Sequence, residues 1–151
     1  MCFGELFLQC GEICSRYLRR VMDIILLSIE GVFHITDSNY AEILQESIVE
    51  TLMCIYHGMS AQGTYKPLIE YIPYIYQFVT FTTDKARRPK LDYVTDTIVL
   101  LTDIYSFYPQ DTRFVIQQQF VIDRLDIMVR YNNDGHLTDK ISFIKKAFGL
   151  L

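Results

Sequence analysis

The sequence predicts an all-α protein in which consecutive helices stack as an α-α superhelix of about three helix pairs. Apolar residues recur at helical spacing along most of the 151 residues, and no stretch alternates apolar and polar residues as a half-buried strand does. Helix starts expected near positions 40, 90 and 136 alternate with starts near 15, 66 and 111, a period of about 45–50 residues. We expect seven helices joined by short turns, and their even spacing favours an open superhelix over a closed helical bundle.

Two helices, Met1–Cys10 and Ser15–Phe33, are expected in the N-terminal part. The first begins at once on apolar residues without a cap, so we expect the chain to continue a longer protein. The second carries an apolar stripe formed by Leu18, Val21, Met22, Ile25, Ile29 and Phe33.

The most regular predicted helix is Tyr40–Met59. Its apolar stripe consists of Leu44, Ile48, Leu52, Ile55 and Met59. Glu42, Glu46 and Glu50 recur every fourth residue on nearly the opposite side, which predicts an acidic face in water. Asn39 followed by Glu42 predicts a capping box at the start of this helix, and the glycines and serine after residue 57 predict its end.

A helix over Lys66–Asp84 is predicted by the stripe of Leu68, Ile72, Ile75 and Val79. Pro73 lies inside it and should kink the helix or shift its start, because proline lacks the backbone N–H. The basic turn Lys85–Lys90 follows. A localisation signal and a contact to an acidic partner are two interpretations of this turn, and a solvated connection between helices is the favoured one. Pro89 is expected at the first position of the next helix.

The C-terminal part is expected to hold three helices. The first, Leu91–Tyr108, has the stripe Leu91, Val94, Ile98, Leu101 and Tyr105. Asp111 or Thr112 should cap the second, which runs to about Tyr131 and aligns Phe114, Val121, Leu125 and Met128. Asn133-Asp134-Gly135 predicts a turn before a final helix over residues 136–149, whose stripe is Leu137, Ile141, Ile144 and Phe148.

Composition narrows the class of protein. With 151 residues, half of them apolar, the chain is too hydrophobic for disorder and long enough for one ordinary core, so we expect a single segment over residues 1–151. The most apolar run, Val21–Phe33, is interrupted by Asp23 and Glu30 and is too short for membrane insertion. The net charge of −4 disfavours a nucleic-acid partner and is compatible with a basic peptide partner.

No motif predicts catalysis, a cofactor or a metal. Cys10 and Cys14 with His34 lack a fourth ligand nearby in the sequence for a zinc site. Cys54 and His57 lie three residues apart on one predicted helix, which places no oxyanion donors around them. A glycine-rich phosphate loop is absent, so we expect a protein that is not an enzyme and whose four cysteines are reduced.

Several segments resemble one family in order and spacing. FGELFLQCGEICSRYLRRVM (Phe3–Met22) resembles the C-terminal arch of importin-β, and LQESIVETLMCIYHGM (Leu44–Met59) is similar to the next outer helix of that family. YIYQFV (Tyr74–Val79) and TIVLLTD (Thr97–Asp103) are in register with the helices that follow. The resemblance to the importin-β (karyopherin-β) family covers nearly the whole chain.

This resemblance implies a C-terminal HEAT-repeat segment with helix pairs at about 1–33, 40–84 and 90–131 and a final helix at 136–149. It also implies a non-enzymatic nuclear transport receptor that binds cargo, or the basic segment of the importin-α adaptor, and shuttles between cytoplasm and nucleus. Ran GTPase and nucleoporins are expected to bind mainly through repeats N-terminal to this segment. Two alternatives stay open: a HEAT scaffold of a phosphatase or chromosome-associated complex, and a helical regulatory part of an enzyme.

In such proteins the second helix of each repeat lines a concave surface that holds the basic segment. The resemblance therefore implies partner-binding roles for Asp23, Glu30, Glu70, Tyr74, Gln77, Phe81, Gln119, Asp123 and Asp126. Carboxylates pair with lysine or arginine, and aromatic rings stack on guanidinium groups. The alternative is that these residues are only a solvated helix face. The chain departs from the family in having no tryptophan and in placing Arg16, Arg20 and Arg130 beside the acids, which disfavours tight importin-α binding.

Overall fold

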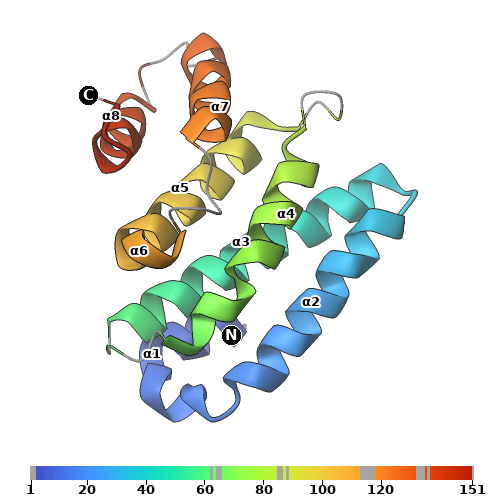
Figure 1. The fold of residues 1–151 in the computed structure, drawn as a ribbon. Helices are drawn as coiled ribbons and strands as arrows, with labels where there is room; N and C mark the ends of the chain where they lie inside the picture. The colour runs from blue at the N-terminus through green and yellow to red at the C-terminus, as the bar shows by residue number, and fades with distance from the viewer. Residues whose placement is uncertain are drawn as a thin grey trace. The chain divides into compact units, whose positions relative to one another are not determined.

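The computed structural model describes residues 3–61, 63, 66–84, 87, 89–112, 118–131, 135 and 137–150. Every regular element within these ranges is a helix (Figure 1), which confirms the predicted all-α class. The chain divides into two compact units, Met1–Tyr74 and Ile75–Leu151. None of the described helices is both long and apolar enough to cross a membrane.

The first unit contains α1 (Phe3–Ser15), α2 (Leu18–His34), α3 (Ser38–Ser60) and the 3-10 helix η1 (Lys66–Tyr71). Helix α3 contacts both α1 and α2, and Figure 1 shows α2 and α3 as neighbours joined by a tight turn. The predicted stripes form the core, since Met22, Leu52, Ile55 and Met59 are fully buried. Burial of apolar surface against neighbouring helices, rather than helix propensity, stabilises elements of this length.

The second unit contains most of α4 (Ile72–Thr82), together with α5 (Leu91–Phe107), α6 (Pro109–Thr112), α7 (Gln118–Tyr131) and α8 (Thr138–Ala147). Helix α5 is central, because it contacts α6, α7 and α8. Its burial extends beyond one stripe and includes three threonines, Thr95, Thr97 and Thr102. Phe148 after α8 stacks on Tyr105 of α5, with ring centroids 4.6 Å apart.

The buried threonines of α5 satisfy their hydroxyl groups within their own helix. Thr95 Oγ1 donates to the Leu91 carbonyl at 2.9 Å, and Thr102 Oγ1 donates to the Ile98 carbonyl at 2.7 Å. Thr97 makes the corresponding bond one residue closer, to the Val94 carbonyl at 2.8 Å. Among the described residues, no buried side-chain nitrogen or oxygen lacks a hydrogen-bond partner. Polar residues therefore enter the core without an unsatisfied group.

Several predicted helix ends are wrong, and the capping geometry explains one of them. Asp37, not Asn39, caps α3: its Oδ1 accepts from the backbone N–H of Asn39 at 3.0 Å and of Tyr40 at 3.1 Å. An N-cap side chain must reach the N–H groups two and three residues on, so the helix begins at Ser38. At the N-terminus, α1 continues to Ser15 across a kink at Cys10, where φ is −128° and ψ is 23°.

The effect of Pro73 is as predicted, because the segment divides into η1 and α4 next to it. Tyr56, fully buried on α3, holds η1 in place by donating its hydroxyl to the Leu68 carbonyl at 3.0 Å. Lys90 is the N-cap of α5, so Pro89 precedes the helix instead of opening it.

The predicted cap of the next helix is also wrong. Asp111 and Thr112 are the last residues of the short helix α6, not the start of α7. Phe114 and the pair Asn133-Asp134 lie outside the described residues. Gly135, which completes that predicted turn, has a positive φ of 69° that favours glycine.

Candidate protein-binding surfaces

In the first unit, the charges of two predicted site residues from different elements act on one tyrosine. Asp23 is exposed on α2 and Glu70 is exposed on η1, and both interact with the phenol of buried Tyr71. Burial raises the pKa of Tyr71 above its ordinary 10.0. The charge of Glu70, a side-chain hydrogen bond to Glu70 and the charge of Asp23 raise it further, while Arg19 lowers it. We call Asp23 and Glu70 the acidic pair.

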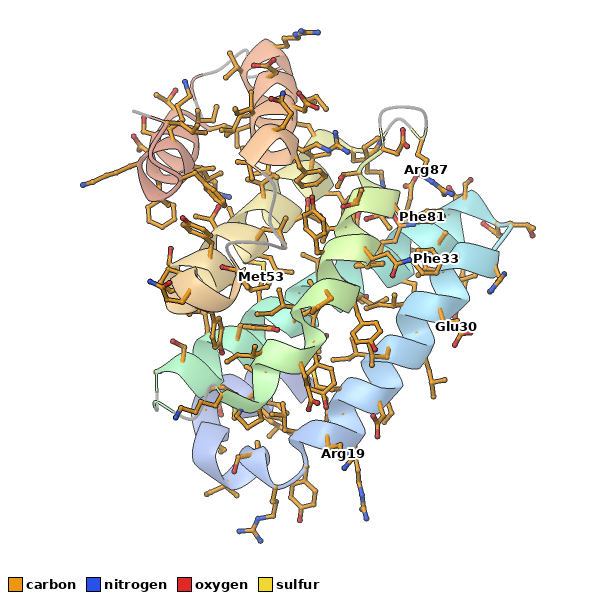
Figure 2. All side chains as sticks on the ribbon, in the orientation of Figure 1. Arg19, Glu30, Phe33, Met53, Phe81 and Arg87 are labelled. Carbon is orange, nitrogen blue, oxygen red and sulfur yellow. The ribbon has the colours of Figure 1, made fainter. Side chains whose placement is uncertain are left out.

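A third predicted carboxylate, Glu30, lies on α2 beyond Asp23. Glu30 is exposed and lies seven residues after Asp23, which places it on the same side of the helix about 10 Å further along the axis. Figure 2 shows Arg19 near the start of α2 and Glu30 near its other end. Tyr74, in the first turn of α4, has 53% of its surface exposed. The described part of the first unit thus presents exposed carboxylates and an exposed aromatic ring, and Arg19 is also exposed on α2.

In the second unit, Phe81 lies near the end of α4 and is half-buried, while Gln77 one turn earlier is exposed. The guanidinium carbon of Arg87 lies 3.5 Å from the centroid of the Phe81 ring. Both residues are labelled in Figure 2, near the C-terminal end of α4. The stacking expected between Phe81 and a partner's arginine is therefore already made by an arginine of this chain.

The remaining predicted residues lie on α7. Gln119 Nε2 donates to Asp123 Oδ1 at 3.0 Å, and Asp126 is exposed one turn further on. Asp123 is half-buried and adjoins Arg124, so its charge is partly balanced by the chain itself. Gln119 and Asp123 are thus two predicted site residues that bond to each other directly.

Sequence reasoning missed the residue that organises the end of α4. Arg124 of α7 has only 8% of its surface exposed, and its Nε donates to Thr83 Oγ1 at 3.0 Å. Its guanidinium also lies 4.6 Å from the centroid of the Phe120 ring. Burial lowers the pKa of Arg124, and the carboxylates of Asp123 and Asp84 oppose that effect. The signal was present, because Arg124 interrupts the apolar stripe formed by residues 121, 125 and 128.

The described residues do not gather metal-binding side chains: no group of three or more His, Cys, Asp or Glu lies together there. Cys10, Cys14 and Cys54 are not joined in disulfide bonds. Burial, and secondarily the neighbouring Cys10, raises the pKa of the Cys14 thiol, so it is less reactive as a nucleophile at neutral pH. The predicted site residues described above are carboxylates, amides and aromatic rings, which are groups that can contact another protein.

Comparison with known proteins supplies the family. Residues 1–130 match the family described as "Importin subunit beta-1-like, TPR repeats". No curated protein and no solved structure matches the chain. The match reaches from α1 to the penultimate residue of α7, and it agrees with helices that pack in adjacent pairs, as in importin-β-like repeats. The chain therefore belongs to the importin subunit beta-1-like family.

Proposed function

We propose that this chain is a non-enzymatic binding segment of a nuclear transport receptor, which holds a basic segment of an importin-α-type adaptor or of a cargo protein. Membership of the importin subunit beta-1-like family carries the proposal, because a repeat scaffold of that family implies binding of other proteins. In this function the protein acts in the cytoplasm and the nucleus, and Ran GTPase and nucleoporins use other repeats of the receptor.

The acidic pair is the part of the surface that suits a basic segment best. Asp23 and Glu70 are exposed carboxylates whose charges both act on Tyr71. Together they outnumber the single guanidinium of Arg19 beside them. Lysine and arginine side chains of a partner are attracted to such a pair, and salt weakens the attraction because the Debye length is only about 10 Å at 0.1 M.

A binding titration with a labelled peptide rich in lysine and arginine tests the proposal. We expect fluorescence anisotropy to show saturable binding that weakens as salt rises. Asp23→Asn combined with Glu70→Gln should weaken binding by about 2- to 30-fold, since each exposed ion pair contributes about 0.2–1 kcal/mol.

The matched control is Glu46→Gln combined with Glu50→Gln on α3. Both glutamates are exposed, and this double variant changes the net charge of the protein by the same amount. If the two double variants weaken binding equally, only net charge matters and the assignment to the acidic pair is wrong. Absence of saturable binding by the unmodified chain would contradict the proposed function itself.

A further inference from the structure

The Phe81 ring is presented by a rigid end of α4. Thr82 Oγ1 donates to the Phe78 carbonyl at 3.0 Å and accepts from the Tyr93 hydroxyl of α5 at 2.7 Å. Thr83 Oγ1 donates to the Val79 carbonyl at 2.6 Å and accepts from Arg124 Nε of α7 at 3.0 Å. Both threonines are buried, so two neighbouring helices fix the turn that carries the ring.

Arg87, which covers this ring, is held differently. It follows α4 in the connection to α5, and its backbone N–H donates to the Asp84 carbonyl at 3.0 Å. Its side chain is exposed, yet its guanidinium carbon lies 3.5 Å from the Phe81 centroid. A fixed aromatic ring thus carries an exposed guanidinium, which is the arrangement that a bound arginine would adopt.

We propose that Phe81 is a guanidinium-binding subsite which the chain's own Arg87 fills in the free protein. An arginine of a bound basic segment takes the place of Arg87 over the ring. This inference rests on the proposed function, and it makes Arg87 an internal competitor of the ligand. It also makes the subsite prefer arginine to lysine, because the planar guanidinium stacks on an aromatic face whereas the ammonium is a compact, strongly hydrated charge.

The experiment compares Arg87→Gln with Lys140→Gln, which removes the same charge from an exposed residue of α8. Two labelled peptides are used that differ only in having arginine or lysine at every basic position. We expect Arg87→Gln to tighten binding of the arginine peptide by about 2- to 5-fold, the range that an exposed cation–π contact corresponds to. Lys140→Gln should tighten it less, and the lysine peptide should respond equally weakly to both variants.

A second measurement reports the displacement directly. The Arg87 Nε–H proton should show an upfield ring-current shift in the NMR spectrum of the free protein, and Phe81→Leu should abolish that shift. Adding the arginine peptide should return the signal toward its ordinary position. This readout does not depend on Phe81→Leu being fully stable, because the unmodified protein is titrated.

The outcomes separate the inference from the function beneath it. Suppose that the arginine peptide binds, that Arg87→Gln and Lys140→Gln change its affinity equally, and that the Arg87 signal does not move. The internal competition is then overturned, and the proposed function still stands. Failure of either peptide to bind any variant overturns both.

Discussion

The hydrogen bond between Arg124 and Thr83 allows a sharp test of how the second unit is stabilised. Thr83→Val keeps the shape of the side chain and removes the acceptor of Arg124 Nε. A hydrogen bond to a charged group contributes about 1.5–3 kcal/mol, and its loss leaves a buried guanidinium nitrogen without this partner. We therefore expect the free energy of unfolding to fall by about 2 kcal/mol, equivalent to about 4–8 °C in melting temperature for a chain of this size.

Thr80 of α4, three residues before Thr83, supplies the matched control. Its Oγ1 donates to the Tyr76 carbonyl at 2.8 Å, just as Thr83 Oγ1 donates to the Val79 carbonyl, but Thr80 is exposed. Thr80→Val should change the free energy of unfolding by no more than about 0.5 kcal/mol. Thermal unfolding followed by far-ultraviolet circular dichroism measures both variants at neutral pH.

A double-mutant cycle makes the test specific to the Arg124 pair. In an Arg124→Met background, Thr83→Val should cost no more than Thr80→Val, because the guanidinium that needs the acceptor is gone. Equal melting temperatures of Thr83→Val and Thr80→Val in the unmodified background would contradict the stabilising role of the Arg124–Thr83 bond. So would an undiminished cost of Thr83→Val in the Arg124→Met background.

Three further changes have defined outcomes. Tyr56→Phe removes the hydroxyl that binds the Leu68 carbonyl and should lower the free energy of unfolding by about 1 kcal/mol in urea titrations. Gly149→Ala places a side chain at a φ of 65° and should cost about 1 kcal/mol in the same assay. The raised pKa of Tyr71 means that the native state keeps this proton when the unfolded chain has lost it, so stability should fall as pH rises above 10.0. Tyr71→Phe should make that fall shallower.

Each of these changes has a control within the chain. Tyr74→Phe alters an exposed tyrosine and should leave the urea midpoint unchanged. Gly31→Ala, in the last turn of α2 with no atom within 4 Å of the added carbon, should be neutral or stabilising. Equal effects at Tyr56 and Tyr74, or at Gly149 and Gly31, would contradict the assigned contacts. If the free energy of unfolding falls equally with rising pH in Tyr71→Phe and in the unmodified protein, Tyr71 does not retain its proton in the native state as inferred.

Helical periodicity predicted the helices and most of their buried residues because burial repeats every turn, and nearly every stripe residue of α2, α3 and α5 is at least half-buried. Helix ends depend instead on which side chain reaches a free N–H, and several residues near a helix start have suitable chemistry. Asp37 and Asn39 are both suitable in type, and only the backbone geometry selects Asp37.

The candidate surfaces were less predictable than the helices, since they depend on contacts between elements. Nothing in the spacing of Asp23 and Glu70 indicates that the charges of both act on Tyr71, because η1 has a different turn from an α-helix and precedes a proline. The Phe81–Arg87 stack depends on the path of a connection whose sequence reads only as a basic turn. Arg124, by contrast, could have been found as a charge on an apolar stripe.

The threonines of the second unit differ in what they demand of their neighbours. Thr95, Thr97 and Thr102 bond only to carbonyls of their own helix, so a facing helix meets them as it would meet valine. Valine and threonine should replace each other freely at these positions during evolution, because exchange strands no polar group. Thr82 and Thr83 also bond to other helices, so the same exchange there removes an acceptor. We therefore expect Thr82 and Thr83 to vary less within this family than the other buried threonines, although all of them are the same residue type.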